Sequence, residues 1–521
     1  MIKQSNKCME CGKDTETRTQ WQCKACYLAL VSMLAKENHL SGDEVSQGGK
    51  LTDTGNGLKF ALVHYRDVAY ATDAGVWFVW NGKVWERDKS GIEMMHRAKF
   101  TAHLLARLAS GMKDGTGEKG DEKDALKAAA TKWAKQSESV ERLNAMVTSA
   151  RTTCRKVLYS DFDKNPWLFN AANMTIDLKT GEAHAHDRKD MLTQISPTVY
   201  DPAATCVKWK QFVLDVMGGS TPMRDYLQRA IGYTLTGDIG GHDMFLPWGP
   251  GGTGKTTFLR VIQGIMGGYC ATPDAEMFMA KRGDSGQPFD LAGLAGKRAL
   301  FASETEENKK LATSKIKRMT GGDRVSACFK GKDYFDFDPV WKIWLATNDF
   351  PKIPAGDGAA WQRVKPIPFN VSYRDTELEI KNYDKVMLAE EEPGILNWML
   401  KGCAMWLTEG LAEPMEVQVA AGELRDAEDY VQRFIDERMP ATTNTQEYAP
   451  QAETFKAFAR WAEDNKEAKD VTANQFGENM RRKGYENKNT RIKGKVTKAW
   501  IGLALVSWME NWHPVIPDGE M

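Results

Sequence analysis

The sequence has no excess charge of either sign, since lysine plus arginine and aspartate plus glutamate each number 70 among 521 residues. Contact with a polyanion would therefore depend on local patches instead of a global field. The longest apolar stretch, near 500–509, is too short and too interrupted to span a bilayer. No apolar run follows the first lysines, as it would in a secretory signal. We expect neither secretion nor membrane insertion.

Cysteine is also scarce, because nine in this length are too few for a disulfide scaffold. Four of them form two CxxC pairs, Cys8, Cys11, Cys23 and Cys26. Two such pairs offer four thiolates to a tetrahedral Zn²⁺, and the metal replaces the core that so small a module lacks. We predict a zinc ribbon that touches DNA or a partner protein, with a redox dithiol as the alternative.

A glycine-rich motif stands near the middle of the chain. Residues 249–256 read GPGGTGKT, a full match to GxxxxGK[ST], between an apolar strand at 244–248 and a helical segment at 256–265. Glycines let the backbone fold around phosphate oxygens, with N–H groups and the helix N-terminus facing the negative charge. A chance glycine-rich turn is the alternative. The predicted triphosphate site comprises Gly249, Pro250, Gly251, Gly252, Thr253, Gly254, Lys255, Thr256 and Thr257.

Within that site, Lys255 would reach the β- and γ-phosphates, and the Thr256 hydroxyl would hold Mg²⁺. A predicted strand at 299–302 leads to Glu304, which could coordinate Mg²⁺ through water and polarise the attacking water. Glu306 is the second choice for this role. A third strand ends at Asn348, whose amide could orient water against the γ-phosphate, although a simple turn former is the alternative.

Lys255, Glu304 and Asn348 fall within about a hundred residues, and this spacing resembles that of superfamily 3 helicases. The chain is specifically similar to the phage and plasmid primase–helicase family, which is related to the poxvirus primase–helicase. The resemblance covers roughly 57–412, with a weaker match at 450–510. The segments that carry it read NPWLFNAANMTIDLKTG, YLQRAIGYTLTGD, IKRMTGGDRVSACFKG, AAWQRVKPIPF and EEPGILNWMLKG.

The resemblance implies an AAA+-like ATPase that uses ATP and Mg²⁺, forms a hexameric ring around one DNA strand and moves 3′ to 5′. It assigns Arg363 to the arginine finger that reaches the ATP of a neighbouring subunit. It also places Lys330 and Lys332 at the tip of a DNA-contacting hairpin. A surface arginine and an ordinary solvated turn are the respective alternatives.

Primer synthesis normally needs a separate N-terminal domain with paired acids and a histidine, and the N-terminal part is too short for one. The candidates Asp161, Asp163, His184 and His186 lie in stretches that match the helicase-associated region instead. We therefore expect no polymerase activity, and a separate primase is a candidate partner.

The expected fold class is an α/β AAA+-like P-loop core, because strands, a glycine loop and helices alternate from 243 to 369. Stretches 40–56 and 420–450 are predicted linkers. Between Arg481 and Lys498, eight basic residues face one acid, which suggests a winged helix with Arg481, Arg482, Arg491, Lys493 and Lys495 on duplex phosphates. A solvated basic face is the alternative. The predicted domains are a zinc ribbon (1–40), an α+β helicase-associated domain (57–205), the ATPase domain (206–375), a helical extension (376–415) and a winged-helix-like domain (450–512).

These patterns favour a replicative DNA helicase of a phage or mobile element that acts in the host cytoplasm on single-stranded and forked DNA. Two other functions remain open. One is an AAA+ replication initiator or helicase loader that hydrolyses ATP without processive unwinding. The other is a DNA-binding protein with a degenerate nucleotide site.

Overall fold

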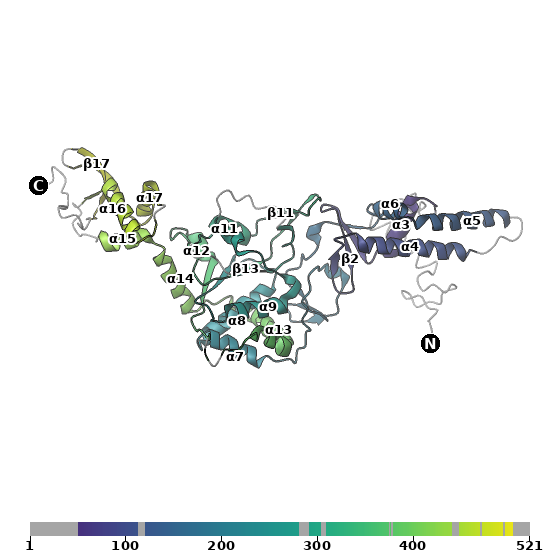
Figure 1. The fold of residues 1–521 in the computed structure, drawn as a ribbon, viewed down its shortest axis with the longest axis horizontal. Coiled ribbons are helices and arrows are strands. Elements are labelled where there is room, and N and C mark those ends of the chain that lie inside the picture. The colour runs from purple at the N-terminus through teal and green to yellow at the C-terminus, as the bar shows by residue number, and fades with distance from the viewer. Residues whose placement is uncertain are drawn as a thin grey trace.

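The computed structural model describes residues 50–112, 120–280, 291–303, 309–374, 376, 379–439, 448–468, 471–492 and 495–503. The molecule is elongated, with the N-terminal helices at one end, an α/β region in the centre and the C-terminal helices at the other end (Figure 1). The four cysteines of the predicted zinc ribbon lie outside the described residues. Across the described ranges, no helix is long and apolar enough to cross a membrane.

The centre of the molecule is a sheet of five parallel strands in the order β14-β8-β13-β10-β9. All five residues of β13 are buried, as are the first four of β8 and of β10. Near-continuous apolar strands of this kind are typical of a parallel sheet that is covered on both faces. The α/β fold class is therefore correct, and the strand bounds are β8 (Met244–Trp248), β9 (Cys270–Ala271), β10 (Ala299–Ser303), β13 (Lys342–Ala346) and β14 (Val364–Pro368).

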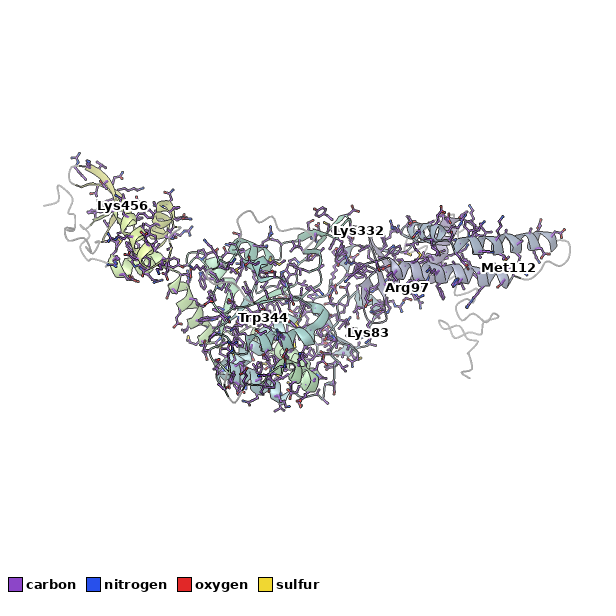
Figure 2. All side chains as sticks on the ribbon, in the orientation of Figure 1. Lys83, Arg97, Met112, Lys332, Trp344 and Lys456 are labelled. Carbon is purple, nitrogen blue, oxygen red and sulfur yellow. The ribbon has the colours of Figure 1, made fainter. Side chains whose placement is uncertain are left out.

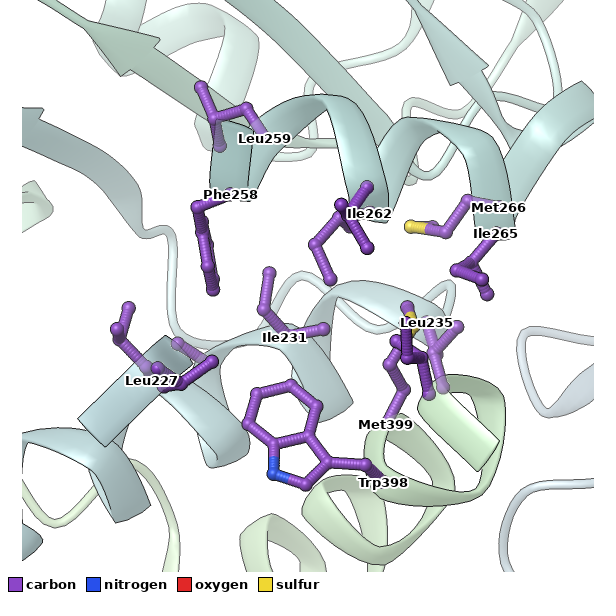
Figure 3. Close-up of a cluster of buried hydrophobic side chains, with 14 of the residues drawn as sticks. Leu227, Ile231, Leu235, Phe258, Leu259, Ile262, Ile265, Met266, Trp398 and Met399 are labelled. Atoms are coloured by element: carbon purple, nitrogen blue, oxygen red, sulfur yellow. The ribbon is translucent and has the colours of Figure 1, made fainter. Parts of the chain in front are cut away.

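Helices cover one face of this sheet. Apolar side chains of α9, including Phe258 and Ile262, face Ile231 of α8 and Trp398 of α13 (Figure 3). Two glycines let α8 and α13 touch through their backbones. A Cβ added at Gly232 would lie 2.0 Å from the nitrogen of Cys403, and a Cβ added at Gly402 would lie 2.0 Å from the carbonyl oxygen of Gln228. The helices of this layer are α7 (Val207–Val216), α8 (Thr221–Leu235), α9 (Lys255–Met266) and α13 (Tyr383–Glu409).

The N-terminal region packs against the opposite face through a second sheet, in the order β3-β2-β1-β4. Phe78 and Trp85 of this sheet belong to the same buried cluster as Leu300 and Ile343 of the central sheet. The two sheets therefore share one hydrophobic core instead of forming separate ones. The strands are β1 (Val68–Ala71), β2 (Val76–Trp80), β3 (Trp85–Arg87) and β4 (Arg155–Val157).

Helices cover the far side of the N-terminal sheet, where Phe60, Trp77 and Met94 are buried together. The stretch from 120 to 150 forms two helices instead of one long helix. The break follows from Ser139, whose hydroxyl accepts a hydrogen bond from the Arg142 N–H and caps a new helix. The four helices are α3 (Asp53–His64), α4 (Ile92–Ser110), α5 (Gly120–Ser137) and α6 (Val140–Ala150).

A buried arginine joins the central sheet to a small three-stranded sheet that follows the N-terminal region. Arg298, just before β10, donates to the carbonyl oxygens of Leu235 and Leu168, at 2.6 Å each. Its guanidinium also lies 4.7 Å from the ring centre of Tyr269. The buried guanidinium group of Arg298 therefore has hydrogen-bond partners, which offset the cost of its burial. The small sheet contains β5 (Leu168–Asn170), β6 (Thr175–Asp177) and β7 (Ala183–His184).

The C-terminal region begins earlier than expected. The predicted linker over 420–450 is wrong in its first half, since α14 reaches Ala427 and α15 follows it. Phe434 of α15 packs edge-to-face on Phe458, with ring centres 5.5 Å apart, so this helix belongs to the C-terminal core. An antiparallel sheet, β15-β17-β16, completes the region. Its elements are α14 (Met415–Ala427), α15 (Tyr430–Arg438), β15 (Tyr448–Pro450), α16 (Gln451–Asp464), α17 (Ala473–Arg482), β16 (Asn487–Ile492) and β17 (Lys495–Ile501).

Asp243, directly before β8, makes the stability pH-dependent. Burial raises the pKa of its carboxyl to about 7, although Lys365 lies 3.7 Å away and opposes the shift. Between about pH 4 and 7 the folded state therefore holds a proton that the unfolded state releases, so this group's contribution to the free energy of unfolding falls as the pH rises through that window.

We expect Asp243→Asn to remove this loss, which amounts to at most about 1.4 kcal/mol per pH unit. Lys365 keeps a partner in Glu413. Urea unfolding at several pH values checks the prediction, and Asp225→Asn on α8 controls for the removal of a negative charge. Parallel stability curves for wild type and Asp243→Asn would contradict it.

Candidate functional site

The predicted triphosphate site is a loop between β8 and α9. Three of its glycines have positive φ, at 138° for Gly249, 83° for Gly252 and 87° for Gly254. Any other residue would be strained there. The surroundings are equally tight, because a Cβ at Gly249 would lie 2.3 Å from the carbonyl oxygen of Phe369, and one at Gly254 would lie 2.8 Å from Val216. The loop conformation therefore needs glycine at these positions.

Lys255 is the first residue of α9, and its side chain turns back over this glycine loop. Its Nζ donates to the carbonyl oxygens of Gly249 and Pro250, at 2.6 and 2.8 Å, and to the hydroxyl of Thr253 at 3.3 Å. All three acceptors are neutral, and burial lowers the pKa of the amine. A negatively charged ligand in the loop would stabilise this ammonium group.

The loop also has free hydrogen-bond donors. Within the described part of the chain, the backbone N–H groups of Gly251, Gly252, Thr253 and Gly254 have no hydrogen-bond acceptor. The first N–H groups of α9 lack partners inside the helix for general reasons. Several N–H groups beside a helix N-terminus and a lysine form a cradle for phosphate oxygens. The residues present therefore fit a nucleoside triphosphate.

Asn348 reaches the same site because β13 lies next to β8 in the sheet. Beyond the strand, the Thr347 N–H donates to the carbonyl oxygen of Pro247 at 3.0 Å, which keeps the two chains side by side. Asn348 is exposed and lines the pocket together with Lys255 and Thr256. The fold thus brings these three predicted residues together from the start of α9 and from the segment after β13.

The structure describes the strand that leads to the predicted acidic residue Glu304, but not Glu304 itself. Strand β10 ends at Ser303, which also lines the pocket and pairs with Ala346 of β13. Glu304 and Glu306 lie outside the described residues. Thr256 is exposed toward the pocket, so its hydroxyl is available to a Mg²⁺ ion. Across the described ranges, no group of three or more His, Cys, Asp or Glu side chains could hold a metal ion.

The pocket has a volume of about 750 Å³ and includes residues that the sequence analysis missed. Segment 372–374, after β14, lies across the glycine loop, and the Tyr373 N–H donates to the Gly252 carbonyl oxygen at 3.0 Å. Arg374 reaches over the loop, with a guanidinium nitrogen 3.4 Å from where a Cβ of Gly251 would be. No motif spacing signals this contact, because only tertiary folding brings 374 to 251.

Aromatic side chains form another wall of the pocket. Phe212 of α7 and Tyr383 of α13 meet edge-to-face, with ring centres 5.8 Å apart. Tyr373 also lines the pocket, as does the carboxylate of Asp215. Flat apolar faces beside a polar group suit a nucleobase. Only the three-dimensional fold reveals this wall, since its members come from three distant segments.

Arg363 does not reach this pocket within its own chain. It is the last residue of α12 (Gly358–Arg363), and the next residue, Val364, pairs with Met244 at the beginning of β8. Arg363 therefore lies at the amino ends of the strands, whereas the pocket lies at their carboxyl ends. The side chain is half-buried, its Nη1 donates to Ala359 O at 2.9 Å, and its buried Nε has no hydrogen-bond partner in the described structure.

Lys330 and Lys332 lie at the tip of an antiparallel hairpin, β11 (Val325–Cys328) and β12 (Tyr334–Phe337). Both lysines are exposed, and Gly331 between them has a φ of 72°. Figure 2 shows Lys332 on the part of the central region that faces the N-terminal helices. The predicted hairpin therefore exists, and its tip carries both lysines.

The candidate polymerase residues have structural partners. The carboxylate of Asp161 accepts a hydrogen bond from the Leu158 N–H at 2.8 Å, and that of Asp163 accepts one from the Thr193 N–H at 2.8 Å. His186 contacts the hydroxyl of Thr175 at 3.2 Å. These side chains stabilise loops, so the absence of primer synthesis stays our prediction.

In the C-terminal region, Arg481 and Arg482 occupy the last turn of α17, where Arg482 pairs with Glu478 at 2.6 Å. Arg491 and Lys495 belong to the β16–β17 hairpin, and Lys493 lies outside the described residues. Helix α17 is followed by the β16–β17 hairpin, and the winged helix stays a prediction. Contact with a duplex stays a prediction.

The glycine loop gives a test that needs no ligand. We expect Gly249→Ala to lower the free energy of unfolding by roughly 1–3 kcal/mol from backbone strain alone, and by more from the overlap with Phe369. Gly422→Ala, in the open interior of α14, is the control and should stabilise by about 0.5–1 kcal/mol. Denaturant titration measures both variants, and equal stability of Gly249→Ala and wild type would contradict the loop geometry.

Two known families match separate parts of the chain. Residues 59–218 match a family described as D5 N terminal like. Residues 248–363, from the end of β8 to Arg363, match a family of unknown function. The apo C-terminal region of NrS-1, a solved structure, is 9% identical with a TM-score of 0.49, covering 86% of this chain and 98% of that one.

Curated relatives are proteins of large DNA viruses. A provisionally named helicase of Acanthamoeba polyphaga mimivirus is 24% identical over 324 residues, which are 58% of this chain and 34% of that protein. A provisionally named primase of African swine fever virus is 21% identical over 329 residues, with the same coverage of both proteins. A provisionally named helicase of Invertebrate iridescent virus 6 is 29% identical over 152 residues, or 27% of this chain and 16% of its own.

The chain thus spans about a third or less of the length of these relatives. The D5-type match falls on the N-terminal region that the resemblance covers, and the relatives carry helicase and primase names. These matches make the chain similar to viral proteins with helicase and primase names, and they agree with its resemblance to the primase–helicase family.

Proposed function

We propose that this chain is an ATP-dependent replicative DNA helicase of a phage or mobile genetic element. It hydrolyses ATP at the subunit interfaces of a hexameric ring and moves 3′ to 5′ on single-stranded DNA, without synthesising primers. The observation that carries the proposal is one pocket that joins the glycine loop, Lys255, Thr256 and Asn348 at the carboxyl ends of parallel strands.

The residues of this pocket have distinct parts in the proposed reaction. The loop N–H groups and Lys255 bind the phosphates, and Arg374 adds a second positive charge above the loop. The amide of Asn348 has no partner among the described residues, which leaves it available to orient a water molecule. Thr256 and Glu304 would hold Mg²⁺, which supplies charge neutralisation on the phosphate oxygens.

The position of Arg363 supports a site shared between subunits. Its side chain is at the opposite edge of the sheet from the pocket, so it cannot serve the ATP bound in its own chain. A guanidinium from a neighbouring protomer would neutralise the γ-phosphate only when the interface has formed. Such an arrangement makes hydrolysis depend on assembly of the ring.

The hairpin provides the contact with DNA. Lys330 and Lys332 are exposed at its tip, where they would bind phosphates without reading sequence, as a motor on DNA requires. The zinc ribbon and the winged-helix-like region would supply additional contacts with DNA or with other replication proteins, including a separate primase.

ATP turnover and strand separation by Lys255→Ala test the proposal. We expect the variant to hydrolyse ATP roughly 100-fold more slowly or worse, because it lacks the ammonium group that binds the phosphates. It should also fail to unwind a forked duplex with a 3′ tail. Lys401→Ala, which removes an exposed lysine of α13, should behave as wild type.

The results for the wild-type chain distinguish the competing functions. ATP turnover without unwinding would contradict the helicase and favour an initiator or helicase loader. Lack of any turnover, with or without single-stranded DNA, would favour a DNA-binding protein with a degenerate nucleotide site.

Mixing two inactive variants tests whether the site is shared. Arg363→Ala and Glu304→Ala should each lose ATPase activity, and their mixture should regain part of it, since some interfaces then combine an intact pocket with an intact Arg363. Gln362→Ala, an exposed neighbour on α12, should keep full activity. No recovery in oligomers shown by crosslinking to contain both variants would contradict a shared site.

A further inference from the structure

Two basic side chains and a tyrosine on the N-terminal region lie beside the hairpin tip and have no part in the ATPase site. We call Tyr70, Arg151 and Lys156 the basic platform. Tyr70 belongs to β1, and Lys156 belongs to β4, the edge strand of the N-terminal sheet. Arg151 follows α6 directly.

The platform is continuous within itself. Tyr70 and Lys156 are register partners in the parallel β1–β4 pair, which places them next to each other across the two strands. The guanidinium carbon of Arg151 lies 5.6 Å from the centre of the Tyr70 ring. Tyr70 in turn contacts Trp77, with ring centres 4.9 Å apart, so the tryptophan packs against the tyrosine ring.

The platform also adjoins the hairpin tip. A Cβ added at Gly75, in the turn between β1 and β2, would lie 3.9 Å from the hydroxyl of Tyr70 and 4.0 Å from Cδ of Lys332. Tyr70 and Lys332 therefore flank the same point from two parts of the chain that are far apart in sequence. The tip lysine and the platform form one surface.

The cations of this surface form no ion pairs. Within the described residues, neither the platform's Arg151 and Lys156 nor the tip's Lys330 and Lys332 has an ion-pair partner. The carboxylates of Asp73 and Asp161 accept hydrogen bonds from the Tyr159 and Leu158 N–H groups and keep their charge, and Asp333 is at the tip. The four cations outnumber these three acids.

We propose that the basic platform binds single-stranded DNA together with the hairpin tip, so that the strand passes from the tip onto the N-terminal region. Unpaired cations would contact successive phosphates, and the ring of Tyr70 would stack on a base. Such a combination of basic and aromatic side chains is typical of single-strand binding without sequence preference. The inference rests on the proposed function, because it takes the hairpin tip as a DNA contact.

Binding of a labelled oligo(dT) to the full chain, measured by fluorescence anisotropy at several salt concentrations, tests the inference. The double variant Arg151→Ala/Lys156→Ala should bind about 10-fold more weakly, with a salt dependence reduced by about one to two ions. Tyr70→Ala should also weaken binding several-fold, whereas Tyr70→Phe should retain it, because stacking needs the ring and not the hydroxyl.

The matched control is Lys132→Ala/Lys135→Ala, which removes two exposed lysines from α5 and should leave binding unchanged. Basal ATPase activity without DNA should be unaffected in Arg151→Ala/Lys156→Ala, which also reports correct folding. If Lys332→Ala weakens binding but the platform variants and the α5 control all bind as wild type, the platform inference is overturned and the proposed function stands. If the wild-type chain does not bind oligo(dT), both fail.

Discussion

The pairing of β13 with β8 is the constraint on which the candidate site depends. Parallel strands end at the same edge of a sheet, so placing β13 between β8 and β10 brings Asn348, the glycine loop and the end of β10 into one pocket. A different neighbour for β8 would leave the same residues intact but far apart. The hydrogen bond from Thr347 to Pro247 extends this pairing beyond the strand, up to the pocket itself.

The same parallel arrangement separates Arg363 from the pocket. Strand β14 also pairs with β8, and Arg363 precedes its first residue, so the arginine is fixed at the amino ends while the loop is at the carboxyl ends. The distance is a property of the sheet and does not depend on side-chain conformation. For this reason the proposed hydrolysis needs a second copy of the chain.

The sequence predicts the local elements well where a strand is a continuous apolar run, as for β8 and β10, and where a motif needs a strand, a loop and a helix in succession. It also predicts the hairpin around Lys330 and Lys332. It does not reveal Arg374, Phe212 or Tyr383 in the pocket, because their proximity arises from tertiary packing between distant segments. The helix α15 was missed because its apolar face is short and lies in a polar stretch.

Shared packing explains why the domain boundaries are hard to place from sequence. Phe78 and Trp85 of the N-terminal sheet are buried with residues of the central sheet, and Arg298 hydrogen-bonds to both Leu168 and Leu235. A composition change along the chain indicates a linker only where each side has its own core. Here one core contains parts of both regions.

The tip end of the hairpin is held from the N-terminal side. The guanidinium of Arg87 lies 3.6 Å from the ring centre of Phe329, and the ring of Tyr159 lies 4.1 Å from that of Phe335. The residues next to the tip lysines are therefore packed against the N-terminal region. Any tension that a strand exerts on the lysines would be borne by the N-terminal sheet, which makes that sheet part of the mechanical frame and not a passive appendage.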